Sequence, residues 1–156
     1  MTARDSIKAE LEIERERIRS FFTAPLMHRG IIVDYVADCS PGCADTIISN
    51  AKNILQVINE ASQDQWPDIE DWISILPPAF TDSFPSTEDE DDWSLEGWLY
   101  WFGLENRFWF LWELAPIGDA QLKISIWIYE HPFPAEAREV LFMKLGTKQL
   151  KEINIR

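Results

Sequence analysis

The residues with the widest chemical repertoire in this sequence are two cysteines and two histidines. Cys39 and Cys43 flank Ser40-Pro41-Gly42, so one thiol precedes a predicted helix and the other lies in its first turn, where the helix dipole favours the thiolate. Their three-residue gap differs from the two-residue gap of dithiol oxidoreductases. His28 and His131 have no spacing relation to the cysteines that would complete a zinc site. We expect ordinary free cysteines, turn histidines and no bound metal.

Other catalytic motifs are missing. The sequence has no Gly-x-Ser-x-Gly elbow, and its six glycines form no phosphate-cradling loop. Two acidic groups, at residues 68–71 and 88–92, lack the central glycine and the twelfth-position glutamate of a calcium loop. The lack of these motifs predicts no cofactor. It favours a non-enzymatic role but leaves open whether the protein is an enzyme.

The distribution of charge is the most informative chemical feature. The chain has 14 basic and 27 acidic residues, a formal net charge of −13. Between Lys52 and Arg107 there is no Lys or Arg. The acids of this window are Glu60, Asp64, Asp68, Glu70, Asp71, Asp82, Glu88, Asp89, Glu90, Asp91, Asp92, Glu96 and Glu105. They account for the whole net charge, which argues against nucleic acid or an anionic membrane as a partner.

All eight tryptophans lie in this window or shortly after it. An acidic field speeds encounter with a basic partner, and large aromatic side chains supply affinity once they are buried in the interface. We expect the acidic run to steer the partner and nearby aromatic residues to anchor it. The predicted partner-binding residues are Glu88, Asp89, Glu90, Asp91, Asp92, Trp93, Trp98, Trp127 and Tyr129.

Both features also have a simpler interpretation. An acidic run is usually a solvated loop that aids solubility, and a tryptophan in a strand usually belongs to the core. If helices cover only one face of the sheet, however, the rings of the other face form an exposed patch. That patch would contain Trp127 and Tyr129, joined either by Trp109 and Glu113 or by Phe110 and Trp112.

The elements that position these residues follow from the spacing of apolar side chains. Residues 3–22 predict an amphipathic helix that docks on the domain or forms a homodimer contact; Glu14 interrupts its apolar stripe, and a long coiled coil is not supported. A β-branched segment predicts a strand at 30–37. Helices are predicted at 41–60 and at 67–76, the second ending at a proline pair.

The tryptophan-rich part predicts strands at 98–102, 107–114 and 122–129, joined by short connections as an antiparallel meander within about residues 94–130. The remaining features are a Pro-rich and acidic loop at 77–92, a helix at 134–146 ending at a glycine, and a short last strand around Ile153 and Ile155. We predict one α+β domain over residues 1–156, with N-terminal helices, the meander, and the C-terminal helix packed on one face of the sheet.

These observations lead to three hypotheses about function, of which the third is a homo-oligomer of structural role that associates through the N-terminal helix. The first is an interaction module, similar to an inhibitor or immunity protein, that binds a basic protein partner through its acidic, Trp-rich surface. The second is a small-ligand binder or enzyme whose pocket is lined by tryptophans and holds a buried glutamate, Glu113 or Glu130. The charged N-terminal segment and the lack of an apolar run of about 18 residues predict a cytoplasmic protein without a membrane span.

Overall fold

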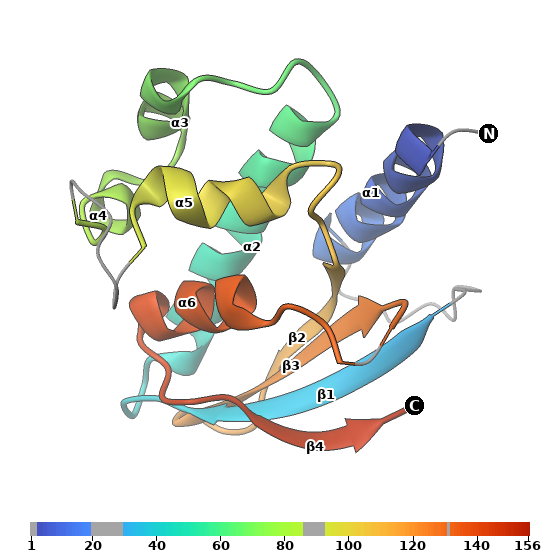
Figure 1. Ribbon diagram of the computed structural model, residues 1–156. Coiled ribbons are helices and arrows are strands. Elements are labelled where there is room, and N and C mark those ends of the chain that lie inside the picture. The colour runs from blue at the N-terminus through green and yellow to red at the C-terminus, as the bar shows by residue number, and fades with distance from the viewer. Residues whose placement is uncertain (1–2, 20–29, 86–92, 131) are drawn as a thin grey trace.

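The computed structural model describes residues 3–19, 30–85, 93–130 and 132–156. It confirms the predicted α+β class, with helices gathered on an antiparallel sheet (Figure 1). In chain order the elements are α1 (Ala3–Arg19), β1 (Ile31–Asp38), α2 (Ala44–Ser62), α3 (Ile69–Ile75), α4 (Pro78–Thr81), α5 (Leu95–Leu99), the 3-10 helix η1 (Tyr100–Phe102), β2 (Trp109–Pro116), β3 (Gln121–Ile128), α6 (Glu136–Leu145) and β4 (Lys151–Ile155).

The sheet combines one local hairpin with two strands from distant parts of the chain. The described strands lie in the order β2-β3-β1-β4, and all neighbours are antiparallel. The predicted hairpin of β2 and β3 is confirmed, and its turn contains Gly118 with φ of +89°, a conformation that favours glycine. β1 pairs with β3 along its full length, from Ile31 opposite Ile128 to Asp38 opposite Gln121.

The strand predicted at 98–102 is wrong: this segment is helical, formed by α5 and η1. Ser94 caps the helix, because its hydroxyl accepts a hydrogen bond from the Gly97 amide at 3.1 Å. Trp98, Leu99 and Phe102 recur at helical spacing and are all buried on one side. A cap and helical periodicity therefore override the β-propensity of the aromatic residues.

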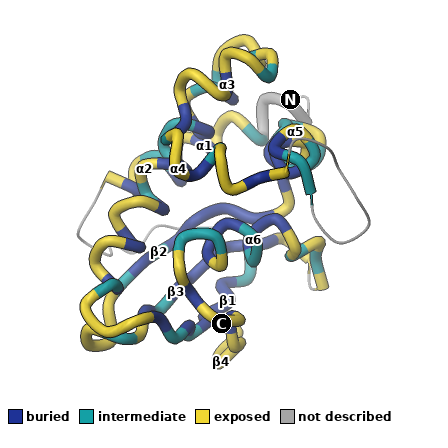
Figure 2. Tube along the Cα trace, turned by 90° about the vertical axis from the view of Figure 1, so that its left-hand side faces the viewer, coloured by how far each residue is buried: buried dark blue, intermediate teal, exposed yellow. Residues whose placement is uncertain are grey.

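The main core lies between one face of the sheet and the helices α2, α5 and α6. Alternate residues of β3 point into it, as predicted for Ile124, Ile126 and Ile128. The predicted helix over 41–60 is confirmed as α2, and α6 packs beside it on the same side of the sheet. Figure 2 shows the central strands mostly buried, whereas α3 and β4 are mostly exposed.

A second, smaller core lies on the opposite face of the sheet. It consists of Leu11, Ile32, Phe110, Trp112 and Trp127, with Leu11 supplied by α1. The prediction that the N-terminal helix docks on the domain is therefore confirmed for the described α1. Helices cover part of both faces of the sheet, which removes the condition for an exposed aromatic patch on the second face.

The helix α1 also covers the edge of the sheet at β2. Glu14 Oε2 accepts a hydrogen bond from the Leu111 amide at 2.7 Å, and Arg17 Nε donates one to the Trp112 carbonyl at 2.8 Å. These backbone groups face away from β3 at a register shift between Leu111 and Glu113. An edge strand with unpaired backbone groups is a site of unwanted pairing, and α1 occupies it here.

None of the helices in the described part of the chain is both long and apolar enough to cross a membrane.

Candidate functional site

Two of the predicted anchor residues are core residues. The side chains of Trp98 and Trp127 are 0% and 1% exposed. Trp98 Nε1 donates to the Ala137 carbonyl at 2.9 Å, and the Trp127 ring stacks on Phe110 with centroids 4.7 Å apart. The helical α5 turns Trp98 inward and α1 helps to bury Trp127, so neither ring is available to a partner in this fold.

The other predicted site residues do not form one group around these rings. Trp93 is half-buried beside Trp101, next to α5. Tyr129 is exposed at the end of β3, where its hydroxyl hydrogen-bonds the Glu10 carboxylate of α1. The acidic run from Glu88 to Asp92 lies outside the described residues.

The face shared with Trp127 contains Phe110 and Trp112, one of the two pairs that the sequence left open, together with one member of the other pair. Phe110 and Trp112 join Trp127, whereas Trp109 belongs to the main core. The register shift in β2 places Glu113 opposite Ser125, on the Trp127 side as well. A single inserted residue therefore mixes the two predicted pairs.

Neither glutamate of the enzyme hypothesis is buried. The Glu113 side chain is 26% exposed and lies 3.8 Å from Lys123 Nζ, while Glu130 is exposed. The strand tryptophans pack in the two cores and line none of the three pockets described below. The structure gives this hypothesis no acid in a tryptophan-lined pocket at those positions.

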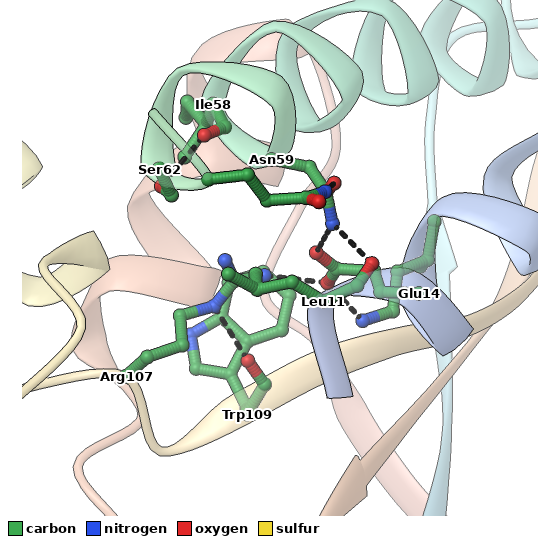
Figure 3. Close-up of polar contacts among 9 residues, drawn as sticks. Leu11, Glu14, Ile58, Asn59, Ser62, Arg107 and Trp109 are labelled. Carbon is green, nitrogen blue, oxygen red and sulfur yellow. Dashed lines mark hydrogen bonds and ion pairs between the residues drawn. The ribbon is translucent and has the colours of Figure 1, made fainter. Parts of the chain in front are cut away.

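Among the described residues, the most deeply buried carboxylate is that of Glu14, which in the sequence is visible only as an interruption of an apolar stripe. Its side chain and that of Arg107 are 0% and 1% exposed. Arg107 Nη2 donates a hydrogen bond to Glu14 Oε2 at 2.5 Å (Figure 3). Asn59 Nδ2 donates to Glu14 Oε1 at 2.9 Å and to the Leu11 carbonyl at 2.8 Å. Desolvation lowers the pKa of Arg107, and the Glu14 carboxylate opposes that change.

This buried cluster has a structural role. Both carboxylate oxygens of Glu14 already accept hydrogen bonds, from Asn59, Arg107 and the Leu111 amide. No oxygen remains free to act on a substrate, and the group is closed to solvent. The cluster joins α1, α2 and β2 at one point. A charged residue at the centre of an apolar helical stripe is the sequence signal that could have revealed it.

Aromatic and acidic side chains that solvent can reach lie around α5 and η1. One side of this helical segment is buried in the core, while Glu96 and Tyr100 are exposed and Trp101 is half-buried on the other. Figure 1 shows α5 crossing in front of α2, away from the strands. We call the exposed and half-buried aromatic and acidic residues here the Tyr100 surface. It comprises Asp64, Trp66, Trp93, Glu96, Tyr100, Trp101 and Glu105.

Two pockets meet at Tyr100, whose side chain is 59% exposed. The larger pocket has a volume of about 660 Å³; its walls include Asp64, Trp66 and Glu105. The second, which we call the Trp93–Trp101 pocket, has a volume of about 510 Å³ and is lined by Trp93, Ser94, Glu96, Gly97, Tyr100 and Trp101. A third pocket of about 300 Å³ shares Ser94 and Glu96 with it.

The walls of these pockets carry aromatic and acidic side chains beside aliphatic and uncharged polar ones. No lysine or arginine is among the described residues that line them. An indole or phenol face attracts a cation through its quadrupole, and a neighbouring carboxylate adds Coulombic attraction. The arrangement therefore suits a positively charged group and disfavours an anion.

The cysteines and histidines form no reaction centre in the described part of the chain. Cys39 and Cys43 are free. Burial raises the pKa of the Cys39 thiol, and the neighbouring Cys43 adds to the rise, so the neutral thiol is favoured at Cys39. Among the described residues, no group of three or more His, Cys, Asp or Glu side chains is placed to hold a metal ion. His28 and His131 lie outside those residues.

Comparisons with protein-family models, with curated protein sequences and with solved structures find no match to this chain.

Proposed function

We propose that this protein is an interaction module that binds a basic protein partner through the Tyr100 surface. The observation that carries the proposal is the coincidence of exposed aromatic rings, exposed carboxylates and two pockets around Tyr100. Trp66 and Tyr100 are 40% and 59% exposed, so a partner could bury large aromatic area. Burial of such rings at the centre of an interface supplies most of the affinity of many complexes.

Electrostatics supports a basic rather than an acidic partner. The described acids between Lys52 and Arg107 are exposed, and no base lies between those two residues in the sequence. The acidic run Glu88–Asp92 precedes Trp93 directly in the chain, so its charge belongs to the same segment. Such a field accelerates encounter with a cationic protein and opposes anionic competitors.

The mechanism that follows is occlusion. A partner held at the Tyr100 surface has its cationic groups neutralised and covered, which is how an inhibitor or immunity protein silences a basic effector. This needs neither a cofactor nor a catalytic group. We place the interaction in the cytoplasm, where thiols such as Cys39 and Cys43 remain reduced.

The test is capture of partners from a lysate of the native cell at low salt, followed by elution with a salt gradient. We compare the wild type with a triple variant of the Tyr100 surface, Asp64→Asn/Glu96→Gln/Glu105→Gln. Since screening weakens an electrostatically steered complex, we expect one basic protein to bind the wild type, to elute with salt and to be lost with the variant.

A charge-matched control separates this surface from general acidity. Glu16→Gln/Asp119→Asn/Glu136→Gln removes the same charge from exposed positions elsewhere, and we expect it to retain the partner. If the two triple variants bind equally, or if only acidic or neutral proteins are retained, the proposal fails.

A further inference from the structure

We propose that the Trp93–Trp101 pocket is a binding site for an arginine side chain of the partner. This inference rests on the proposed function and names the group that the Tyr100 surface recognises. The guanidinium would lie in the pocket beside the stacked Trp93 and Trp101 rings and the Tyr100 ring, with the Glu96 carboxylate as its counter-charge.

The two indoles present a cation-binding geometry. Their ring centroids lie 6.4 Å apart, and their planes are inclined by only 21°. The two rings stack on each other, so a cation reaches them from the pocket that they line, and an aromatic ring attracts a cation within about 6 Å. Tyr100 closes one side, because its ring meets Trp101 edge to face with centroids 5.4 Å apart. The pocket thus has three aromatic walls.

The charge of the pocket selects a cation. Glu96 is exposed in the first turn of α5, and the remaining described lining residues are uncharged. No base in the described lining competes for Glu96. A neutral ligand would leave this carboxylate unpaired in the interface, whereas a guanidinium satisfies it.

The planar guanidinium fits this pocket better than an ammonium. A flat, delocalised guanidinium loses little hydration when it stacks on an aromatic ring such as the exposed Tyr100, while lysine carries a compact and strongly hydrated charge. The protein itself uses this contact elsewhere. Arg17 lies 3.8 Å from the centroid of the Trp112 ring, and Arg138 lies 4.1 Å from that of Tyr35.

The test uses capped tripeptides as probes: acetyl-Gly-Arg-Gly-amide, its lysine equivalent, and its citrulline equivalent, which has the shape of arginine without the charge. Binding is followed by NMR through the tryptophan indole N–H signals. We expect the arginine peptide to shift the signals of Trp93 and Trp101 and to leave those of the buried Trp98 and Trp127 unchanged. Lysine should bind more weakly, and citrulline about fivefold or more weaker than arginine.

Variants at exposed positions avoid the risk of unfolding. Tyr100→Ala and Glu96→Gln should each weaken binding of the arginine peptide by about two- to fivefold, with an otherwise unchanged NMR spectrum as evidence of folding. Trp101→Leu, at a half-buried position that packs against the main core, should abolish the response in a protein whose remaining NMR signals are unchanged. The matched control is Phe108→Leu, which removes an exposed aromatic ring that lies outside the Tyr100 surface and lines none of the three pockets, and it should leave the affinity unchanged.

The proposal is overturned if the arginine peptide does not bind, if citrulline or lysine binds as tightly, or if Phe108→Leu weakens binding while Trp101→Leu does not. Its failure is distinguishable from failure of the proposed function. Capture of a salt-released basic protein without arginine binding removes only the arginine site. Arginine binding at Trp93 and Trp101 without a captured basic protein removes only the proposed function.

Discussion

At the scale of single residues, the fold depends on two carboxylates in unusual places. Glu14 is fully buried and holds Arg107, Asn59 and the β2 backbone together. Asp34 is buried on the sheet, where it receives hydrogen bonds from Arg156 and Ser125. A buried charge is tolerated only when it is paired and hydrogen-bonded. Loss of either carboxylate therefore leaves a partner unsatisfied.

We expect Glu14→Gln to destabilise the fold by about 3–5 kcal/mol, because it leaves the buried Arg107 charge unpaired. The measurement is urea unfolding followed by tryptophan fluorescence. Glu14→Leu/Arg107→Leu, which removes both charges, should recover part of that loss. Glu16→Gln, an exposed position on the same helix, should change stability by less than about 0.5 kcal/mol. A Glu14→Gln protein as stable as the wild type would contradict the structural role of the pair.

The Asp34 carboxylate should make stability depend on pH. Burial opposes its ionisation, but hydrogen bonds from Arg156, Ser125 and Asn154 outweigh burial and lower its pKa below 3.8. The contribution of the Asp34 carboxylate to the stability of the fold is therefore fully present above about pH 4, and it is lost as the pH falls through the folded-state pKa.

We expect Asp34→Asn to be less stable than the wild type at pH 7, and the difference to narrow as the pH falls below 4. Urea unfolding at a series of pH values between 7 and 2.5 measures it. In an Arg156→Gln background the pH-dependent part of the stability difference should shrink, because the hydrogen bonds from Arg156 that lower the pKa of Asp34 are gone. A difference that stays constant to pH 2.5 would show that Asp34 does not titrate with a lowered pKa.

At the scale of elements, α1 links the two cores and covers the edge of the sheet at β2. The helix α1 contributes to both cores, through Leu11 on one side of the sheet and Ile18 on the other. This placement requires α1 to run along the edge of β2. Its interrupted apolar stripe is therefore suited to a sheet edge with backbone groups to satisfy, and a continuous stripe would leave those groups unpaired.

We expect Leu11→Ala to cost about 2–5 kcal/mol, because it removes a fully buried side chain and leaves a cavity beside Trp127 and Phe110. Hydrogen exchange should show loss of protection in α1 and at the Leu111 amide before the rest of the sheet. The matched control is Lys8→Ala on the exposed side of α1, with an expected change below about 0.5 kcal/mol. Equal exchange rates in both variants would place α1 outside the cooperative fold.

At the scale of the whole molecule, we expect salt to raise the stability of the folded protein and to weaken its binding to a partner. A formal charge of −13 on 156 residues makes the folded chain repel itself, and its acids are concentrated between Lys52 and Arg107. Salt screens this repulsion between exposed groups but leaves the buried Glu14–Arg107 pair almost unaffected. The same screening weakens attraction to a basic partner.

We therefore expect the melting temperature of the free protein to rise between about 0.01 and 0.3 M NaCl, as the Debye length falls from about 30 Å to below 8 Å. Thermal unfolding curves recorded by circular dichroism in NaCl and in KCl measure this change in melting temperature. The triple variant Asp64→Asn/Glu96→Gln/Glu105→Gln should show a smaller rise. A melting temperature that falls with salt would mean that attractive surface ion pairs outweigh the repulsion.

The sequence by itself determined the α+β class, the helix α2, the strand β1, the hairpin of β2 and β3, and the inward face of Ile124, Ile126 and Ile128. These features depend on local periodicity, caps and turns, which the order of residues specifies directly. The sequence also localised the charge imbalance, because counting residues needs no structure. The inferred preference for a basic partner follows from that count and remains a proposal.

Only the tertiary structure decided which aromatic residues are accessible. Trp98 and Trp127 became core because a cap made 95–99 helical and because α1 covered part of the second face, whereas Trp66 and Tyr100 remained exposed. Glu14 and Arg107, 93 residues apart, meet only when α1 reaches β2. Burial and long-range pairing depend on where distant segments pack, and local patterns do not encode that placement.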